Sequence, residues 1–230
     1  QDRIIMVNIE KTKFEGIYFY CKDKKKILLT KNLTPSKKYF NEDLISENNI
    51  EYREFDVRRS KLASAVLKGI NFLPFKQDSI VLYLGASYGY TSSYVSDICN
   101  NGFIFALDFA PRVLMDLYFL CKERENMTCL LYDANQPELY KDKIIEVDII
   151  YQDIAQKNQV EIFLKNIARF LKKKGYCIIA IKARSIDTLK KPDNIYKEVE
   201  KELEKNLRII DKIKLDPFQK DHCFFVCQKK

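Results

Sequence analysis

The apolar run at residues 80–84 ends abruptly at Gly85, and a second glycine, Gly89, closes the turn that follows. Five apolar residues that stop at a glycine are typical of a buried parallel strand entering a tight turn. Residues 91–93 are Thr-Ser-Ser, and we expect one of these hydroxyls to cap a helix that begins there. A strand, a glycine turn and a helix in this order let a ligand approach the carboxyl end of a parallel sheet.

The spacing of the glycines narrows the class of ligand. The turn lacks the Gly-x-Gly-x-x-Gly pattern of dinucleotide sites, and no lysine follows it as in a phosphate-binding loop. The next apolar run, 103–107, ends at Asp108, close to the interval of about 20 residues at which an acidic side chain meets a nucleotide ribose. We therefore expect an adenosine-containing cofactor without phosphates, such as S-adenosylmethionine. The alternative is a turn that binds no ligand.

After residue 55, apolar runs alternate with stretches of helical periodicity. We expect strands at 80–84, 103–107, 128–132, 147–151 and 176–181, with helices between them. The lysines at 172–174 are expected at the end of a helix, where cations suit its dipole. The last two strands, near 207–214 and 222–228, lie too close in sequence for a crossover helix, so one of them should be antiparallel.

Residues 1–55 follow a different pattern. Short β-rich segments at 4–9, 16–21 and 27–30 are separated by polar turns, and helical periodicity is scarce. The sequence thus predicts an α/β protein in two parts. A small, β-rich and mostly antiparallel domain occupies 1–55, and a doubly wound sheet with an antiparallel last strand occupies 56–230.

The charge balance points to a polyanionic partner. The chain carries 40 lysines and arginines against 32 acidic residues, a net charge of +8. RNA or DNA is the first candidate, and solvated lysines at turns and helix ends are the alternative. Seven cysteines without a Cys-x-x-Cys pair and a single histidine predict reduced thiols and no metal site. Neither a membrane span nor a signal peptide is visible in the sequence.

Charged side chains stand where four of the expected strands end. These residues are Asp108, Asp133, Asp153 and Lys182. Either Asp133 or Asp153 alone would more often be a helix cap. Because ligands bind at the carboxyl edge of an open α/β sheet, four such residues in register predict a functional site at this edge.

Several segments, in order along nearly the whole chain, resemble the fibrillarin family. They are VRRSKLASA (57–65), VLYLGASYGYTSSYVSDI (81–98), VDIIYQDIAQ (147–156), IIAIKARSID (178–187) and LDPFQKDHCFFV (215–226). KILLTKNLTP (26–35) and IEYREFD (50–56) resemble the family's N-terminal domain. Fibrillarins are S-adenosylmethionine-dependent RNA ribose 2′-O-methyltransferases guided by box C/D small RNAs. The resemblance therefore implies that activity and a Rossmann-like class I methyltransferase sheet.

The resemblance also implies which residues carry the function. The cofactor contacts would be Gly85, Tyr90, Thr91, Asp108, Phe109, Asp133, Ala134, Asp153, Ile154, Ala155 and Gln156. The family's catalytic lysine, aspartate, lysine and histidine fall on Lys61, Asp153, Lys182 and His222. The chain departs from the family pattern at Tyr90, where a threonine is usual, at Asp108, where a glutamate is usual, and at Tyr88, where a small residue is usual.

The chemistry of methyl transfer explains why a site would need these four residues. A ribose hydroxyl is a poor nucleophile while protonated, so its position and its deprotonation must both be controlled. A lysine acts as a base only where its surroundings disfavour the ammonium form. We interpret Lys182 as the base or the hydroxyl-orienting group and Asp153 as the group that holds it. Lys61 and His222 would be substrate-side and supporting groups.

The sequence contains no recognisable base-reading module, and lysine clusters attract phosphates without reading sequence. The resemblance implies that a box C/D guide RNA directs the enzyme to rRNA. It also implies a Nop-family scaffold protein and a kink-turn-binding protein as partners, and the nucleus and nucleolus as location. Two alternatives stay open: a histone glutamine methyltransferase that uses the same cofactor, and a non-catalytic RNA-binding subunit that has lost cofactor affinity through Tyr88, Tyr90 and Asp108.

Overall fold

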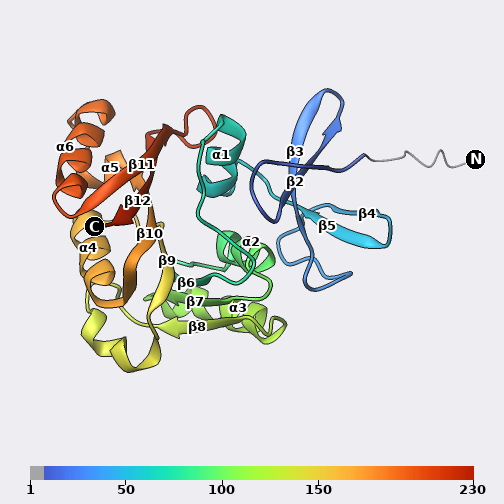
Figure 1. The fold of residues 1–230 in the computed structure, drawn as a ribbon, viewed down its shortest axis with the longest axis horizontal. Coiled ribbons are helices and arrows are strands. Elements are labelled where there is room, and N and C mark those ends of the chain that lie inside the picture. The colour runs from blue at the N-terminus through green and yellow to red at the C-terminus, as the bar shows by residue number, and fades with distance from the viewer. Residues whose placement is uncertain (1–7) are drawn as a thin grey trace, which may run out of the picture.

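The computed structural model describes residues 8–230 and contains two β-sheets (Figure 1). The larger has the strand order β11-β12-β10-β9-β6-β7-β8. Its strands are β6 (Ile80–Leu84), β7 (Phe103–Asp108), β8 (Met127–Leu131), β9 (Val147–Gln152), β10 (Leu171–Lys182), β11 (Leu207–Lys214) and β12 (His222–Lys229). β12 runs antiparallel to β10 and β11, whereas the pairs from β10 to β8 are parallel. The predicted α/β sheet with an antiparallel last strand is confirmed.

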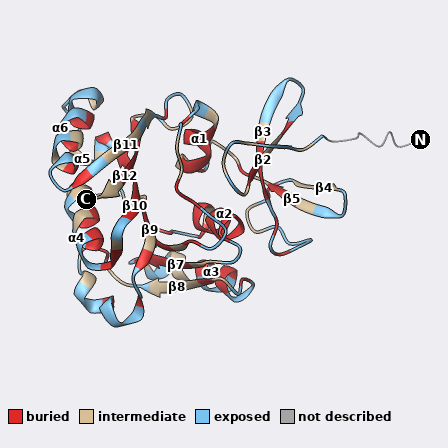
Figure 2. Cartoon of the chain, in the orientation of Figure 1, coloured by how far each residue is buried: buried red, intermediate tan, exposed pale blue. Residues whose placement is uncertain are grey.

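Alternate residues of each central strand pack against different helices. In β6, Val81 and Tyr83 belong to one apolar core with residues of α1 (Lys61–Lys68), α2 (Tyr90–Ile98) and α3 (Pro111–Lys122). Leu82 and Leu84 belong to a second core with residues of η1 (Pro137–Lys143), α4 (Gln159–Phe170), α5 (Ala183–Ile186) and α6 (Pro192–Glu204). The strands are therefore buried on both faces, as Figure 2 shows, which explains their continuous apolar runs.

A five-stranded antiparallel sheet precedes the larger one. Its strands are β1 (Glu10–Lys11), β2 (Ile17–Lys22), β3 (Lys25–Lys31), β4 (Leu44–Glu47) and β5 (Ile50–Glu54), in the order β1-β2-β3-β5-β4. Of the strand expected at 4–9, residues 4–7 lie outside the described residues, residues 8 and 9 are not in a strand, and β1 begins at Glu10. Sequence reasoning missed β4 and β5, because β4 has only four residues and β5 is interrupted by charged residues.

A cluster of buried charges joins the N-terminal sheet to α2. Asp97 accepts hydrogen bonds from Arg53 Nε at 2.6 Å and from Arg124 NH1 at 2.7 Å. Glu42 lies 3.1 Å from another nitrogen of Arg53, and the side chains of Arg53, Asp97 and Arg124 are fully buried. Burial raises the pKa of Asp97, but Arg124 and Arg53 together outweigh it and lower that pKa overall. Asp97 is therefore ionised and fixes β5 against α2.

The start of α2 differs from the expected hydroxyl cap. The helix begins at Tyr90 with Gly89 as its N-cap, and no side chain makes a cap hydrogen bond. The hydroxyl of Thr91 donates to Ser60 Oγ at 3.1 Å instead. The prediction of a hydroxyl cap at 91–93 was wrong because the helix begins directly after Gly89, so all three hydroxyl residues lie inside it.

The lysines at 172–174 do not end a helix. α4 stops at Phe170, and β10 begins at Leu171, which pairs with Val147 of β9. Lys172 Nζ forms an ion pair with Asp148 at 2.7 Å. The prediction of a helix terminus was wrong because pairing with the neighbouring strand starts before the charged residues.

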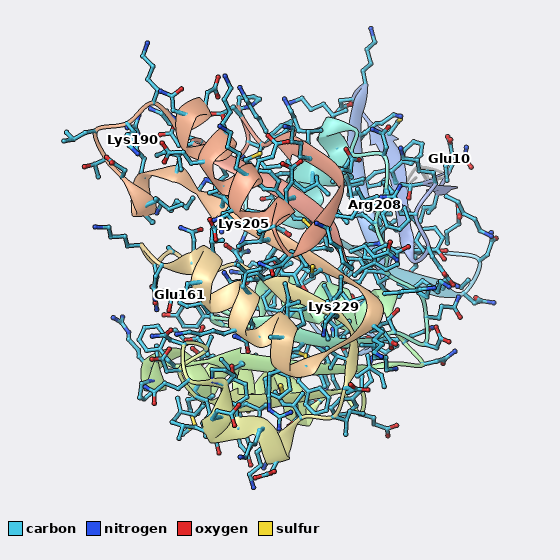
Figure 3. All side chains as sticks on the ribbon, turned by 60° about the vertical axis from the view of Figure 1, so that its left-hand side comes forward. Glu10, Glu161, Lys190, Lys205, Arg208 and Lys229 are labelled. Carbon is cyan, nitrogen blue, oxygen red and sulfur yellow. The ribbon has the colours of Figure 1, made fainter. Side chains whose placement is uncertain are left out.

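The outer surface is rich in charged side chains, as Figure 3 shows for Glu161 on α4 and Lys205 after α6. Some of the lysines have partners: Lys190 pairs with Glu198 at 2.9 Å, and Lys229 donates to the carbonyls of Ile167 and Leu171 at the end of α4. Within residues 8–230, no helix is both long and apolar enough to cross a bilayer. The same residues contain no group of three or more His, Cys, Asp or Glu side chains that could hold a metal ion.

Candidate active site

Two adjoining cavities lie where β6, β7, β8 and β9 end. The smaller has a volume of about 250 Å³ and is lined by Gly85, Ser87, Leu107, Asp108, Phe109, Asp133, Ala134, Asp153, Ile154, Ala155 and Gln156. The larger, of about 780 Å³, shares Gly85, Ser87 and Asp153 with it. The sheet edge therefore gathers most of the residues expected to contact a cofactor around the smaller cavity.

Gly85 lines both cavities. Its backbone conformation explains why a glycine must follow β6. Its φ is +82°, a region that L side chains rarely adopt. A Cβ at this position would lie only 2.4 Å from the carbonyl oxygen of Asp153. Its N–H donates to the carbonyl of Leu107 at 2.9 Å. A glycine is thus required by both its conformation and the close approach of β6 and β9.

Asp108 connects the glycine turn to the loop after β7. Its Oδ2 accepts a hydrogen bond from Ser87 N at 2.8 Å, and its Oδ1 accepts one from Ala110 N at 3.0 Å. Each carboxylate oxygen can accept a second hydrogen bond, which leaves capacity for a ligand hydroxyl. Sequence reasoning missed Ser87 because it contributes a backbone N–H, which nearly every residue type carries.

Tyr90 and Thr91, also expected at the cofactor, line only the larger cavity. Lys61 and Asp153 lie in the same wall. The remaining lining includes aromatic and charged side chains from the N-terminal segment and α3: Lys37, Tyr39, Phe40, Arg59, Asp116, Phe119, Lys122 and Glu123. The larger cavity therefore has a wall of aromatic side chains and of charged side chains of both signs.

The four residues expected to be catalytic come together at this edge. Lys61 Nζ lies 2.9 Å from Asp153 Oδ2. Lys182 and His222 are direct partners in the antiparallel register of β10 and β12, so their side chains share a face of the sheet. The pKa of His222 is lowered mainly by burial and also by Lys61 and Lys182, while a hydrogen bond with the carbonyl of Lys220, at 2.7 Å, and Asp153 oppose this. The four side chains thus share one electrostatic environment.

Comparison with known proteins agrees with the resemblance seen in the sequence. A model of the fibrillarin family matches residues 8–230. The chain belongs to the fibrillarin family. The fibrillarin-like rRNA/tRNA 2′-O-methyltransferase of Methanocaldococcus jannaschii is 46% identical over 215 residues, which cover 93% of this chain and 94% of that protein. The protein of the same name from Thermococcus onnurineus is 43% identical, over 97% of this chain and 100% of its own length.

Solved fibrillarin structures have the same fold. A Methanococcus jannaschii fibrillarin, described as a pre-rRNA processing protein, has a TM-score of 0.93 at 44% identity and covers 97% of each chain. Aeropyrum pernix fibrillarin, crystallised with natively bound S-adenosyl-L-methionine, has a TM-score of 0.89 at 39% identity, over 96% of this chain and 98% of that one. The fibrillarin of a fibrillarin/Nop5p complex has a TM-score of 0.86 at 38% identity, over 96% and 100%.

One contact in this fibrillarin site differs from the expected arrangement. Asp153 forms its ion pair with Lys61, not with Lys182, whose side chain is exposed. The backbone of Lys182 is held by Gln159: its N–H donates to Gln159 Oε1 at 3.3 Å, and its carbonyl accepts from Gln159 Nε2 at 3.4 Å. Sequence reasoning missed Gln159 because it lies just beyond the motif at 147–156, and its contact with Lys182 joins residues 23 positions apart in the chain. Lys182 therefore has a fixed backbone and a side chain that is free of the Lys61–Asp153 pair.

Proposed function

We propose that this chain transfers a methyl group from S-adenosylmethionine to ribose 2′-hydroxyls of rRNA, as the catalytic subunit of a box C/D ribonucleoprotein. The observation that supports it best is the convergence of Lys61, Asp153, Lys182 and His222 at the carboxyl edge of the sheet, where Lys61 and Asp153 line the larger cavity. Relatives that are 43–46% identical over most of their length are named as rRNA/tRNA 2′-O-methyltransferases, which agrees with this chemistry.

The residues of the smaller cavity fit the cofactor. Asp108 offers carboxylate oxygens to ribose hydroxyls, and Phe109, Ala134 and Ile154 offer apolar surface to a flat base. Gly85 allows the backbone of Asp153 and the side chain of Ile154 to approach closely and form the wall of this cavity. The absence of a pyrophosphate-binding glycine pattern agrees with an adenosine group that carries no phosphate. When bound, S-adenosylmethionine supplies an electrophilic methyl group on a sulfonium.

The side chains around Lys182 prepare the ribose hydroxyl for attack. The exposed Lys182 side chain accepts the hydroxyl proton or orients the hydroxyl by a hydrogen bond. Lys61 is held by Asp153 and lies on the substrate side of the site. His222, buried and with a lowered pKa, is neutral at pH 7 and supports Lys182 across the β10–β12 pair. We assign Lys61, Asp153, Lys182 and His222 these roles as part of the proposal.

Target choice is assigned to RNA and protein partners. The fibrillarin of the Nop5p complex is 38% identical to this chain over its whole length, which supports a Nop-family scaffold as partner. We further propose a box C/D guide RNA that supplies the target sequence and a kink-turn-binding protein that holds it, because the chain shows no base-reading module. The nucleolar location stays a prediction.

The two alternatives are separable by experiment. Histone glutamine methylation is not favoured, because the relatives are named for rRNA and tRNA; incubation of the particle with labelled cofactor, rRNA and histones shows which product carries the label. A non-catalytic subunit would lack cofactor affinity, which calorimetry with S-adenosylmethionine measures directly.

The decisive test is site-specific methylation by a reconstituted particle. We expect a particle of this chain, a guide RNA, a Nop-family protein and a kink-turn-binding protein to methylate one ribose opposite the guide, mapped by primer extension. The isolated chain should bind RNA weakly and methylate poorly. Strong site-specific methylation by the isolated chain would contradict the guided mechanism. Failure of the full particle to methylate RNA would contradict the proposed methyltransferase activity.

A further inference from the structure

The first two residues of α2 hold the segment that leads into α1. The N–H of Asp56 donates to the hydroxyl oxygen of Tyr90 at 3.1 Å. The hydroxyl of Thr91 donates to Ser60 Oγ at 3.1 Å. Ser60 is the N-cap of α1, and its hydroxyl oxygen also accepts from Ala63 N at 3.3 Å. Two consecutive side chains of α2 therefore bind the two ends of the segment 56–60.

Burial and neighbouring side chains strengthen these contacts. Thr91 is 7% exposed and Ser60 fully buried, so water competes little for their hydrogen bond. The guanidinium carbon of Arg59 lies 4.2 Å from the centre of the Tyr90 ring. The ring of Phe40 meets the same tyrosine edge-on, with ring centres 5.0 Å apart. Arg59 also donates to the carbonyl of Phe40 at 2.6 Å. The Tyr90 ring is thus fixed by an arginine and an aromatic ring as well as by its hydroxyl.

The segment held in this way ends at a residue of the proposed catalytic set. Lys61 follows Ser60 directly and is the first residue of α1, a helix of eight residues. Helix ends fray unless their first turn is capped and anchored, and fraying here would shift the backbone of Lys61. The Lys61 ammonium forms an ion pair with Asp153, 2.9 Å away, in the wall of the larger cavity. Its reach therefore depends on the anchored position of Ser60.

We propose that Tyr90 and Thr91 are positioning residues that hold the start of α1, and through it Lys61, against Asp153. This inference rests on the proposed methyltransferase function, because Lys61 matters only if that reaction takes place. It assigns the two hydroxyls to protein groups, whereas the family resemblance assigns these positions to the cofactor. The contacts support the new assignment, since each hydroxyl is already engaged with the segment 56–60.

The test uses Tyr90→Phe and Thr91→Val, which remove one hydroxyl each and keep the size of the side chain. Tyr118→Phe is the matched control, because Tyr118 is an exposed tyrosine on α3 outside both cavities. Methylation is measured in the reconstituted particle, to give kcat at saturating S-adenosylmethionine. Cofactor affinity is measured by calorimetry, and amide hydrogen exchange of residues 56–63 is measured on each full-length chain.

For each of the two variants we expect kcat to fall about tenfold, because small misplacements of a catalytic group are costly, while cofactor affinity stays within about twofold. Exchange at 56–61 should become faster, and the control should match the wild type. A loss of cofactor affinity of about fivefold or more overturns the proposal, since the hydroxyls would then be cofactor ligands. Unchanged exchange at 56–61 overturns it too, and so does unchanged kcat in a particle whose wild type is active. If the wild-type particle does not methylate RNA, the proposed function fails, and the exchange measurement still decides whether the hydroxyls anchor α1.

Discussion

Lys61 Nζ and Asp153 Oδ2 lie 2.9 Å apart, so one ion pair links the first residue of α1 to the loop that follows β9. The two side chains are 24% and 20% exposed, and an ion pair in such a partly hydrated place adds little to stability. Its consequence is geometric: the carboxylate engages Lys61, and the Lys182 side chain is left outside this pair, as its proposed role requires.

Removal of the Lys182 amine should stop the chemistry and leave the fold intact. We expect Lys182→Ala to lower the methylation rate of the particle by about 100-fold or more, the usual contribution of a general base. The measurement is the single-turnover rate against pH, with Lys201→Ala as control, because Lys201 is exposed on α6. Near wild-type turnover of Lys182→Ala would end this assignment.

The single histidine of the chain reports on the site without any activity assay. Because burial, Lys61 and Lys182 lower its pKa, we expect the His222 ring signal in NMR to titrate below the unperturbed value of about 6.5. Lys61→Met should raise this pKa, and Asp153→Asn should lower it further, since Lys61 lowers and Asp153 raises it. Shifts in the same direction in both variants would show that the four residues do not share one environment.

His222 also makes the folded protein slightly less stable in weak acid. The folded pKa of His222 lies below the unfolded value, so the unfolded chain binds the proton first as the pH falls. The stability present above about pH 6.5 is therefore lost progressively as the pH falls toward the folded pKa. Urea unfolding at pH 7.5 and 5.5 should show a smaller loss for His222→Gln than for the wild type.

Gly85 lines the proposed cofactor cavity, and Gly69, which lies outside it, provides a matched control for a substitution there. Both have positive φ, +82° and +92°, but a Cβ at Gly85 would lie 2.4 Å from the Asp153 carbonyl, whereas nothing lies within 4 Å of one at Gly69. Either change to alanine should cost about 1–2 kcal/mol of backbone strain. Only Gly85→Ala should also weaken S-adenosylmethionine binding, by about tenfold or more, as an atom forced into the cavity wall displaces Asp153. Equal affinities in calorimetry would argue against a cofactor at this edge.

The Asp97 carboxylate holds the N-terminal sheet against α2 in the folded protein. We expect Asp97→Asn to destabilise the protein by about 3–5 kcal/mol at pH 7, because the carboxylate that Arg53 and Arg124 share would become neutral, and only Glu42 would remain as a charged partner of Arg53. Urea unfolding measures this, with the exposed Asp142 changed to Asn as control. The folded pKa of Asp97 is lowered, so its contribution is present above the ordinary value of 3.8 and is lost as the pH falls through the folded pKa. The variant should therefore lose less stability between pH 5 and pH 2 than the wild type.

Much of this architecture could be predicted from the sequence. The strands of the larger sheet were expected within a few residues of their observed bounds, since burial on both faces produces continuous apolar runs. The glycine turn and the acidic strand ends predicted that their side chains gather at one edge of the sheet, because the carboxyl ends of parallel strands meet there. The family motifs supplied residue roles, and the cavity lined by Gly85, Asp108 and Asp133 lies where those motifs meet.

The partners of individual polar groups were decided only by the tertiary structure. The sequence does not indicate that Asp153 pairs with Lys61 and not Lys182, or that the Thr91 hydroxyl meets Ser60. Nor does it show that Arg53 and Arg124 converge on Asp97 from separate parts of the chain. Periodicity records whether a residue is buried, which is a local property, whereas a hydrogen bond or an ion pair depends on distances of about 3 Å between groups that only the folded chain brings together.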